Sequence, residues 1–318
     1  MPDSSSNWTP EVLPRAPRRH PGRAVATVLI LLVVGLLFYS VANNPRVGWD
    51  QVGIYLFNGT ILTGVVTTVE LLVICQVLGI VFGVLLALCR VSHNPLLRGL
   101  SGSYSWLFRG TPVLVQLILW FNLGLLFPRL GIDVPFTSIG FSVETNRLIS
   151  GFVASLLALT LHEAAYMMEI VRGGIASVSA GQVEAALALG MPPHRVQIRI
   201  VLPQTLLAIV PATGNQLVHM LKSTSLVAFV AGGDLLTRAQ GIYSGNYQVI
   251  PLLIVVSLWY LAMTAIISVF QYFLERRVGR GYGQTKPSGR SNWSMLRGRF
   301  GTRKINDRVA SSPIARTA

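Results

Sequence analysis

Long apolar stretches separated by short polar ones make up most of this chain. A helix that crosses the hydrocarbon core of a membrane needs about 20 mostly apolar residues. Six segments meet this requirement, at residues 24–42, 60–89, 112–128, 148–171, 205–230 and 250–274. The pattern therefore predicts an all-α fold, a polytopic transmembrane bundle of about six helices that needs no strands.

The composition excludes an ordinary soluble protein. Of 318 residues, 52% are hydrophobic and 12% are charged, whereas soluble domains have about 25% charged residues. Cys75 and Cys89 lie in one apolar segment, and their spacing fits neither a metal site nor a disulfide framework. We expect no cofactor and no metal.

The net charge is +14, and the distribution of the basic residues indicates the membrane topology. Most Lys and Arg residues fall on four segments: the chain up to Arg23, residues 90–109, residues 172–199, and the chain from Arg276 onward. Basic residues on alternate loops follow the positive-inside rule, so the lipid bilayer is the expected partner rather than nucleic acid. Both termini are predicted to be cytoplasmic in a multi-pass membrane protein.

The ends of the chain differ from its middle. Residues 1–23 form a basic cytoplasmic segment, 24–42 a first membrane helix, and 43–58 an extracytoplasmic loop. Residues 59–275 hold the other spans. The tail 276–318 is basic and has few large apolar residues, so we expect it to be disordered.

The first apolar segment has an alternative interpretation. A basic stretch followed by an apolar one is also typical of a secretory signal peptide. The apolar run in 24–42 is longer than the ~7–15 residues of a signal's central region, which favours a membrane helix.

The loop between the fourth and fifth spans, residues 181–204, has the sequence GQVEAALALGMPPHRVQIRIVLPQ. Gln182–Leu189 favours a helix, Gly190 a helix stop, and the prolines at 192 and 193 the start of a second helix. Val183, Ala186 and Leu187 share one stripe of the first helix, which can dock into a groove of a cytoplasmic partner. The alternative is that this helix packs on its own membrane domain.

This loop resembles the EAA loop of ATP-binding-cassette importer permeases. In that motif Glu-Ala-Ala is followed by Gly and then by Ile-x-Leu-Pro. The matching residues are Glu184, Ala185, Ala186, Gly190, Ile200, Leu202 and Pro203.

Three further stretches, 108–116 (FRGTPVLVQ), 164–182 and 214–226, resemble motifs of the polar-amino-acid permease family, in the same order. The resemblance covers about residues 55–275. The first helix and the basic tail are additions to the family's five-helix core.

The resemblance implies one permease subunit in the cytoplasmic membrane of a prokaryote. Its partners are two cytoplasmic ATPase subunits, a second permease subunit, identical or homologous, and an extracytoplasmic amino-acid-binding protein. Glu184 is the expected anchor on the ATPase, and Gly190 permits the bend. The chain itself is not expected to be an enzyme, because Lys222-Ser223-Thr224 matches only the end of a phosphate-binding loop.

Polar residues inside apolar spans are the candidates for the substrate pathway. Glu163 is predicted to take an ammonium group or a cationic side chain, and four residues of the fifth span to take a carboxylate; the alternative for Asn215 and Gln216 is interhelical hydrogen bonding. The full set is Gln116, Glu163, Tyr166, Asn215, Gln216, Lys222 and Thr224.

Helical spacing adds structural predictions. His162 and Tyr166 lie four residues apart and should share a helix face, and Glu169 and Arg172 should form an ion pair. Gly64, Gly79 and Gly83 should permit close helix packing.

Two other classes of protein were weighed. An ion-coupled carrier or channel without an ATPase has no use for an ATPase-docking loop. An intramembrane acid-base enzyme would need its His and Glu residues in one arrangement, whereas they lie scattered over different spans. The sequence therefore favours the importer permease.

Overall fold

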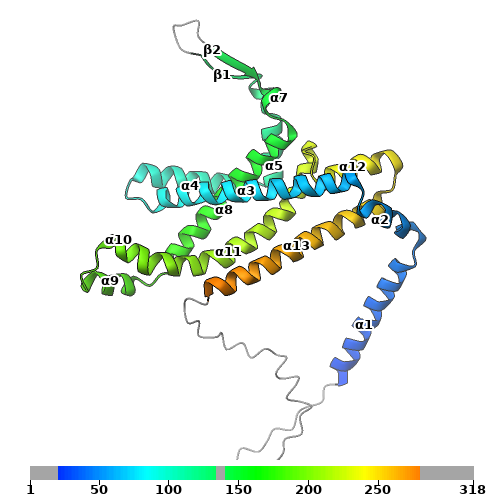
Figure 1. The fold of residues 1–318 in the computed structure, drawn as a ribbon, viewed down its shortest axis with the longest axis horizontal. Helices are drawn as coiled ribbons and strands as arrows, with labels where there is room; N and C mark the ends of the chain where they lie inside the picture. The colour runs from blue at the N-terminus through cyan, green and yellow to red at the C-terminus, as the bar shows by residue number, and fades with distance from the viewer. Residues whose placement is uncertain (1–20, 134–139, 280–318) are drawn as a thin grey trace, which may run out of the picture. The chain divides into compact units, whose positions relative to one another are not determined.

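The computed structural model describes residues 21–133 and 140–279 (Figure 1). The predictions for residues 1–20 and 280–318 lie outside this range. The elements are α1 (Pro21–Ala42), η1 (Pro45–Val47), α2 (Trp49–Leu56), α3 (Gly59–Val91), α4 (Pro95–Gly110), α5 (Val113–Phe121), α6 (Leu123–Leu126), β1 (Arg129–Asp133), β2 (Gly140–Glu144), α7 (Thr145–Leu148), α8 (Gly151–Ala176), α9 (Ala180–Ala188), α10 (Pro193–Val196), η2 (Gln197–Val201), α11 (Leu202–Ser223), η3 (Thr224–Val230), α12 (Leu235–Asn246) and α13 (Val249–Gly279).

The described residues form two compact units. One holds the chain up to Met168 together with Leu217–Ala265; the other holds Glu169–Gln216 and the chain from Ile266. The boundaries fall inside α8, α11 and α13, and each unit is described by itself.

The prediction of a polytopic all-α bundle is confirmed. Within the described residues, five segments are long and apolar enough to cross a membrane: Val25–Ala42, Gly59–Val91, Gly151–Ala176, Pro193–Val230 and Val249–Gly279. They match five of the six predicted spans.

The predicted span 112–128 is not one continuous helix: α5 and α6 both lie within it but are separated at Asn122, which has φ −92° and ψ 14°. Apolar chain in this region forms the short helices α5 and α6, and α4 precedes them. Thr111 before Pro112 is extended, with φ −110° and ψ 141°, because proline disfavours a helical conformation in the residue before it. This break separates α4 from α5 at the residue where the predicted span begins.

Glycines bring α3 and α8 together in the first unit. A Cβ atom at Gly79 would lie 2.5 Å from Cγ of Glu163, and one at Gly83 would lie 2.5 Å from Cβ of Met167. The predicted role of these glycines in close packing is confirmed. Tyr104 of α4 donates a hydrogen bond of 2.7 Å to the Leu161 carbonyl, which ties α4 to α8.

Helix α12 packs on the N-terminal turns of α3. Gly64 lies against the backbone of Leu235, where an added Cβ would come within 2.8 Å of Cα. The Leu235 amide donates to the Thr68 hydroxyl at 3.0 Å, and the Asp234 carboxylate caps the helix by accepting from the Leu236 and Thr237 amides. The seam between α3 and α12 is therefore held by backbone contact.

One element departs from the expectation that the chain needs no strands. β1 and β2 pair as an antiparallel ribbon, with Arg129 opposite Glu144 and Leu130 opposite Val143. This ribbon lies in the mixed polar and apolar segment after the short helices, where pairing satisfies backbone groups that no helix uses. The expectation is corrected for this loop only.

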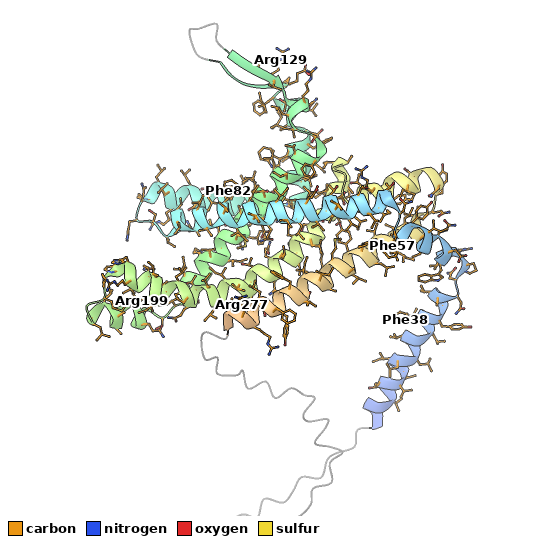
Figure 2. The ribbon with its side chains drawn as sticks, in the orientation of Figure 1. Phe38, Phe57, Phe82, Arg129, Arg199 and Arg277 are labelled. Carbon is orange, nitrogen blue, oxygen red and sulfur yellow. The ribbon has the colours of Figure 1, made fainter. Side chains whose placement is uncertain are left out.

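Helix α1 presents side chains to its surroundings on all sides. None of the residues of its apolar window is buried, and Phe38, labelled in Figure 2, is 74% exposed. A helix that is apolar all round is typical of a membrane span in contact with lipid.

We predict that Gly83→Val destabilises the protein by about 1–3 kcal/mol, because the added side chain overlaps Met167 in a packed interface. Thermal unfolding of the purified protein in detergent measures this. Gly99→Val is the matched control, since nothing lies within 4 Å of a Cβ at Gly99. Equal melting temperatures for the two variants would contradict the packing described above.

Candidate functional site

The break between α4 and α5 leaves a backbone carbonyl without its helical partner. In a continuous helix the Phe108 carbonyl would accept from the amide of residue 112, but Pro112 has no N–H. The Gln116 side chain replaces it: Nε2 donates to the Phe108 carbonyl at 2.9 Å and to the Thr111 carbonyl at 3.0 Å. Gln116, 6% exposed, thus holds the two helices at the break.

Gln116 also has an acceptor to spare. Its Oε1 atom is buried and has no hydrogen-bond partner among the described residues. Nε2 lies 3.4 Å from Nδ1 of His162 on α8. A buried amide oxygen without a partner is costly, so this atom is suited to accept from a bound N–H group.

Aromatic and cationic side chains gather beside this break. The rings of His162 and Tyr166 have centroids 4.9 Å apart, which confirms that they share a face of α8. The His219 ring lies 6.4 Å from Tyr166, and Cζ of Arg109 lies 5.3 Å from the Tyr166 centroid. We call Arg109, Gln116, His162, Tyr166 and His219 the Tyr166 cluster.

One side of the Tyr166 cluster is accessible. Arg109 and His219 are exposed, Tyr166 is half-buried, and His162 and Gln116 are buried. Arg109 offers guanidinium donors that match a carboxylate and His219 a further ring N–H, whereas the acceptor of Gln116 is covered in this structure. The arrangement can hold a small molecule that has both an anionic and a hydrogen-donating group.

Glu163, the predicted ligand of an ammonium group, is 1% exposed. It accepts from Nε2 of Gln76 on α3 at 3.1 Å and packs on Gly79. The carboxylate is therefore enclosed between α3 and α8, apart from the accessible side of the Tyr166 cluster.

The predicted residues of the fifth span are placed differently from one another. Thr224 is buried and donates to the Leu221 carbonyl at 2.6 Å, whereas Lys222 is exposed. Asn215 is exposed and its Oδ1 lies 3.5 Å from Nε2 of Gln271 on α13, which favours the interhelical alternative. Gln216 is half-buried.

The predicted loop helix exists in the second unit. α9 ends at Ala188, and Gly190 has a φ of +79°, a left-handed conformation that glycine adopts without strain. The Met191 amide donates to the Ala186 carbonyl at 3.1 Å, which closes the turn. Gln204 donates to Oε1 of Gln182 at 2.6 Å and ties the loop to α11.

The exposed surface of residues 181–204 combines leucines and one acid with polar and basic side chains, among them Arg195 and Arg199. Glu184 and Ala185 are exposed, Leu187 is 44% exposed and Leu189 is 85% exposed, while Ala186 is buried. Ile200 and Pro203 are half-buried where α11 begins, and Leu202 is 50% exposed. The loop offers exposed leucines to a partner.

Other structural predictions stand. Glu169 and Arg172 form the expected ion pair at 2.8 Å. Three members of the Tyr166 cluster, Arg109, His162 and His219, were not among the predicted site residues. Arg109 was taken as a loop cation; the signal that points to it is its place three residues before a helix-breaking proline inside an apolar region.

Fold and site together define a multi-pass helical transport protein with a polar cluster inside the bundle. Residues 79–280 match the family described as binding-protein-dependent transport system inner membrane component. The chain belongs to this family, the membrane permeases of ATP-binding-cassette importers.

Among its relatives is the arginine transport system permease protein ArgU of Corynebacterium glutamicum, 39% identical over 88% of each chain. The arginine transport system permease protein ArtQ of Bacillus subtilis is 32% identical over 69% of this chain and 92% of its own. The putative glutamine transport system permease protein GlnP of Rickettsia typhi is also 32% identical, with the same coverage.

Solved structures agree. A crystal structure of an amino acid ABC transporter with histidines has a TM-score of 0.59 and 31% identity, over 69% of this chain and 94% of that one. The inward-facing MetNI methionine ABC transporter, at 19% identity and a TM-score of 0.53, shares the fold.

We predict that Gln116→Met lowers stability by about 1–3 kcal/mol, because it leaves the Phe108 and Thr111 carbonyls unsatisfied in an apolar surrounding. Thermal unfolding in detergent measures the loss. Gln197→Met, at an exposed position, serves as control and should unfold like the parent protein. A parental melting temperature for Gln116→Met would show that the break does not depend on this side chain.

Proposed function

We propose that this permease carries amino acids with a cationic side chain, arginine above all, inward across the cytoplasmic membrane. The Tyr166 cluster supports an amino acid as the cargo, because the exposed Arg109 and His219 match a carboxylate beside a broken helix. Transporters commonly form substrate sites at such breaks, where backbone and side-chain polar groups are available inside the membrane. The choice of a cationic side chain is supported by the names of two relatives.

The two ends of an amino acid match the cluster. Arg109, with His219 beside it, binds the α-carboxylate, since a guanidinium forms two parallel hydrogen bonds to that group. Oε1 of Gln116, which is buried in this structure, accepts from the α-ammonium once the side chains that cover it move aside. The face of Tyr166 is available to a cationic side chain once Arg109 swings towards the carboxylate.

Arginine is chosen from two relatives whose names specify it, ArgU and ArtQ. Glutamine is the second candidate, because the GlnP relatives are named for it. A glutamine carrier would use the same carboxylate contacts but would gain nothing from the Tyr166 ring.

The power comes from separate subunits. Two ATPases dock on the α9 loop in the cytoplasm, with Glu184 as the charged contact and the leucines at 187 and 189 as apolar ones. Closure of the ATPase pair moves this loop, and Gly190 lets the loop keep its bend. A second permease and an extracytoplasmic binding protein complete the importer, with both termini of this chain in the cytoplasm.

We expect Arg109→Met to raise the KM for arginine uptake roughly 10- to 100-fold, the effect of losing one charge-assisted contact. Uptake of labelled arginine by the assembled importer in vesicles, with glutamine, lysine and histidine as competitors, measures it. Arg98→Met, an exposed residue on the same helix, is the control. Unchanged arginine uptake by Arg109→Met would refute the proposed binding site. Stronger competition by glutamine than by lysine would refute the proposal that the transported amino acid is cationic.

Gly190→Ala should leave the complex assembled but depress uptake several-fold, because a left-handed residue with a Cβ costs about 1 kcal/mol and tilts the loop. The measurement pairs copurification of the ATPase with ATP-driven uptake. Gly181→Ala, inside α9 and without positive φ, is the control. The coupling role is refuted if Gly190→Ala transports at the parental rate.

A further inference from the structure

Helix α3 carries a carboxylate on the side that faces away from its own bundle. The buried residues of α3 that meet α8, such as Gly79, lie on one side of the helix. Glu70 precedes Gly79 by nine residues, which at about 100° per residue places it on the opposite side, ~180° away. Glu70 is exposed.

The surroundings of Glu70 are apolar. Its neighbours on the same face, Val66, Val73 and Val77, are 55%, 53% and 54% exposed. The hydroxyl of Thr67 donates back to the Thr63 carbonyl of its own helix, so it does not reach Glu70. No hydrogen bond or ion pair of Glu70 is found in the described part of the chain.

Lipid cannot cover this position at low cost. An ionised carboxylate inside a span is unfavourable against hydrocarbon, and such residues almost always face another protein group or water. Glu70 is eleven residues from the start of α3, about 16 Å along the helix at 1.5 Å per residue, well inside the apolar segment. In the assembled protein, a donor must therefore reach it.

A free cation lies close by on the same outer part of the bundle. Arg238 on α12 is exposed, and its aliphatic stem packs on α3 at Gly64, where an added Cβ would lie 3.0 Å from Cγ. No carboxylate within 4 Å of Arg238 is found in the described residues. Gly64 is six residues before Glu70, about 9 Å along the helix.

An acid and a base on adjoining elements, neither with a partner within residues 21–133 and 140–279, make a surface that complements itself. In a two-fold contact between identical subunits, the acid of one subunit faces the base of its partner, and the base faces the partner's acid. One acid and one base on the same patch therefore form two pairs. The apolar helix α1 cannot supply the partner of Glu70, because residues 24–42 contain no charged donor.

We propose that a second copy of this chain covers the α3 face around Glu70, and that Glu70 pairs with Arg238 of the partner subunit. This rests on the proposed function in one respect, that the importer holds two permease subunits. It adds which face joins them and that the two are identical.

Cross-linking of the assembled importer tests the face. In a background with Cys75→Ala and Cys89→Ala, Val73→Cys is treated with a short bifunctional maleimide. The expected product has the mass of two copies of this chain. Phe82→Cys, exposed on α3 but about 120° round from Glu70, is the control and should stay monomeric. An adduct with a different permease, or none, overturns the proposal.

Charge exchange tests the pair. Glu70→Arg and Arg238→Glu should each lower the Val73→Cys adduct roughly tenfold, because each leaves like charges facing one another in an apolar contact. The double variant should restore it to near the parental yield. A double variant as poor as the single ones overturns the pairing. Arginine uptake is followed in parallel: a normal adduct without arginine transport refutes the cargo alone, and arginine transport without any adduct refutes this interface alone.

Discussion

The hydrogen bond from Gln116 to the Phe108 carbonyl is the interaction on which the site depends. Pro112 removes the amide that this carbonyl would have used, and an unsatisfied carbonyl inside an apolar bundle is expensive. A side chain four residues further on satisfies it. The side-chain nitrogen of Gln116 donates to the backbone, which leaves the side-chain oxygen for another partner. This oxygen has no hydrogen-bond partner among the described residues, so the bond that stabilises the break also sets the unpaired acceptor of the Tyr166 cluster.

Close packing of α3 on α8 fixes the other side of this region. Glycine at 79 and 83 lets the helices approach until Glu163 and Met167 fill the space that side chains would take. Glu163 is thereby enclosed and bound to Gln76, and the face of α8 that carries His162 and Tyr166 is turned towards the break. Small residues on one helix thus decide which polar residues of another are accessible.

Charged residues inside the spans indicate which surface of the chain is the proposed contact with another subunit. Glu163 and Glu169 have partners inside the chain, at Gln76 and Arg172, whereas Glu70 lies among exposed valines. Because lipid does not solvate a charge, each charged residue in an apolar span indicates that a protein group or water lies beside it. The exposed leucines of the α9 loop give the corresponding indication at the proposed contact with the ATPase subunits.

The sequence by itself determined the membrane class, five of the spans, the helix–turn–helix of the α9 loop and the family, because each depends on local composition or on a contiguous motif. Only the tertiary structure decided the rest. That Glu163 is enclosed and that Arg109 lies over Tyr166 depend on residues dozens of positions apart. The physical reason is that hydropathy measures transfer to lipid, whereas accessibility inside a bundle is set by which neighbour fills the space.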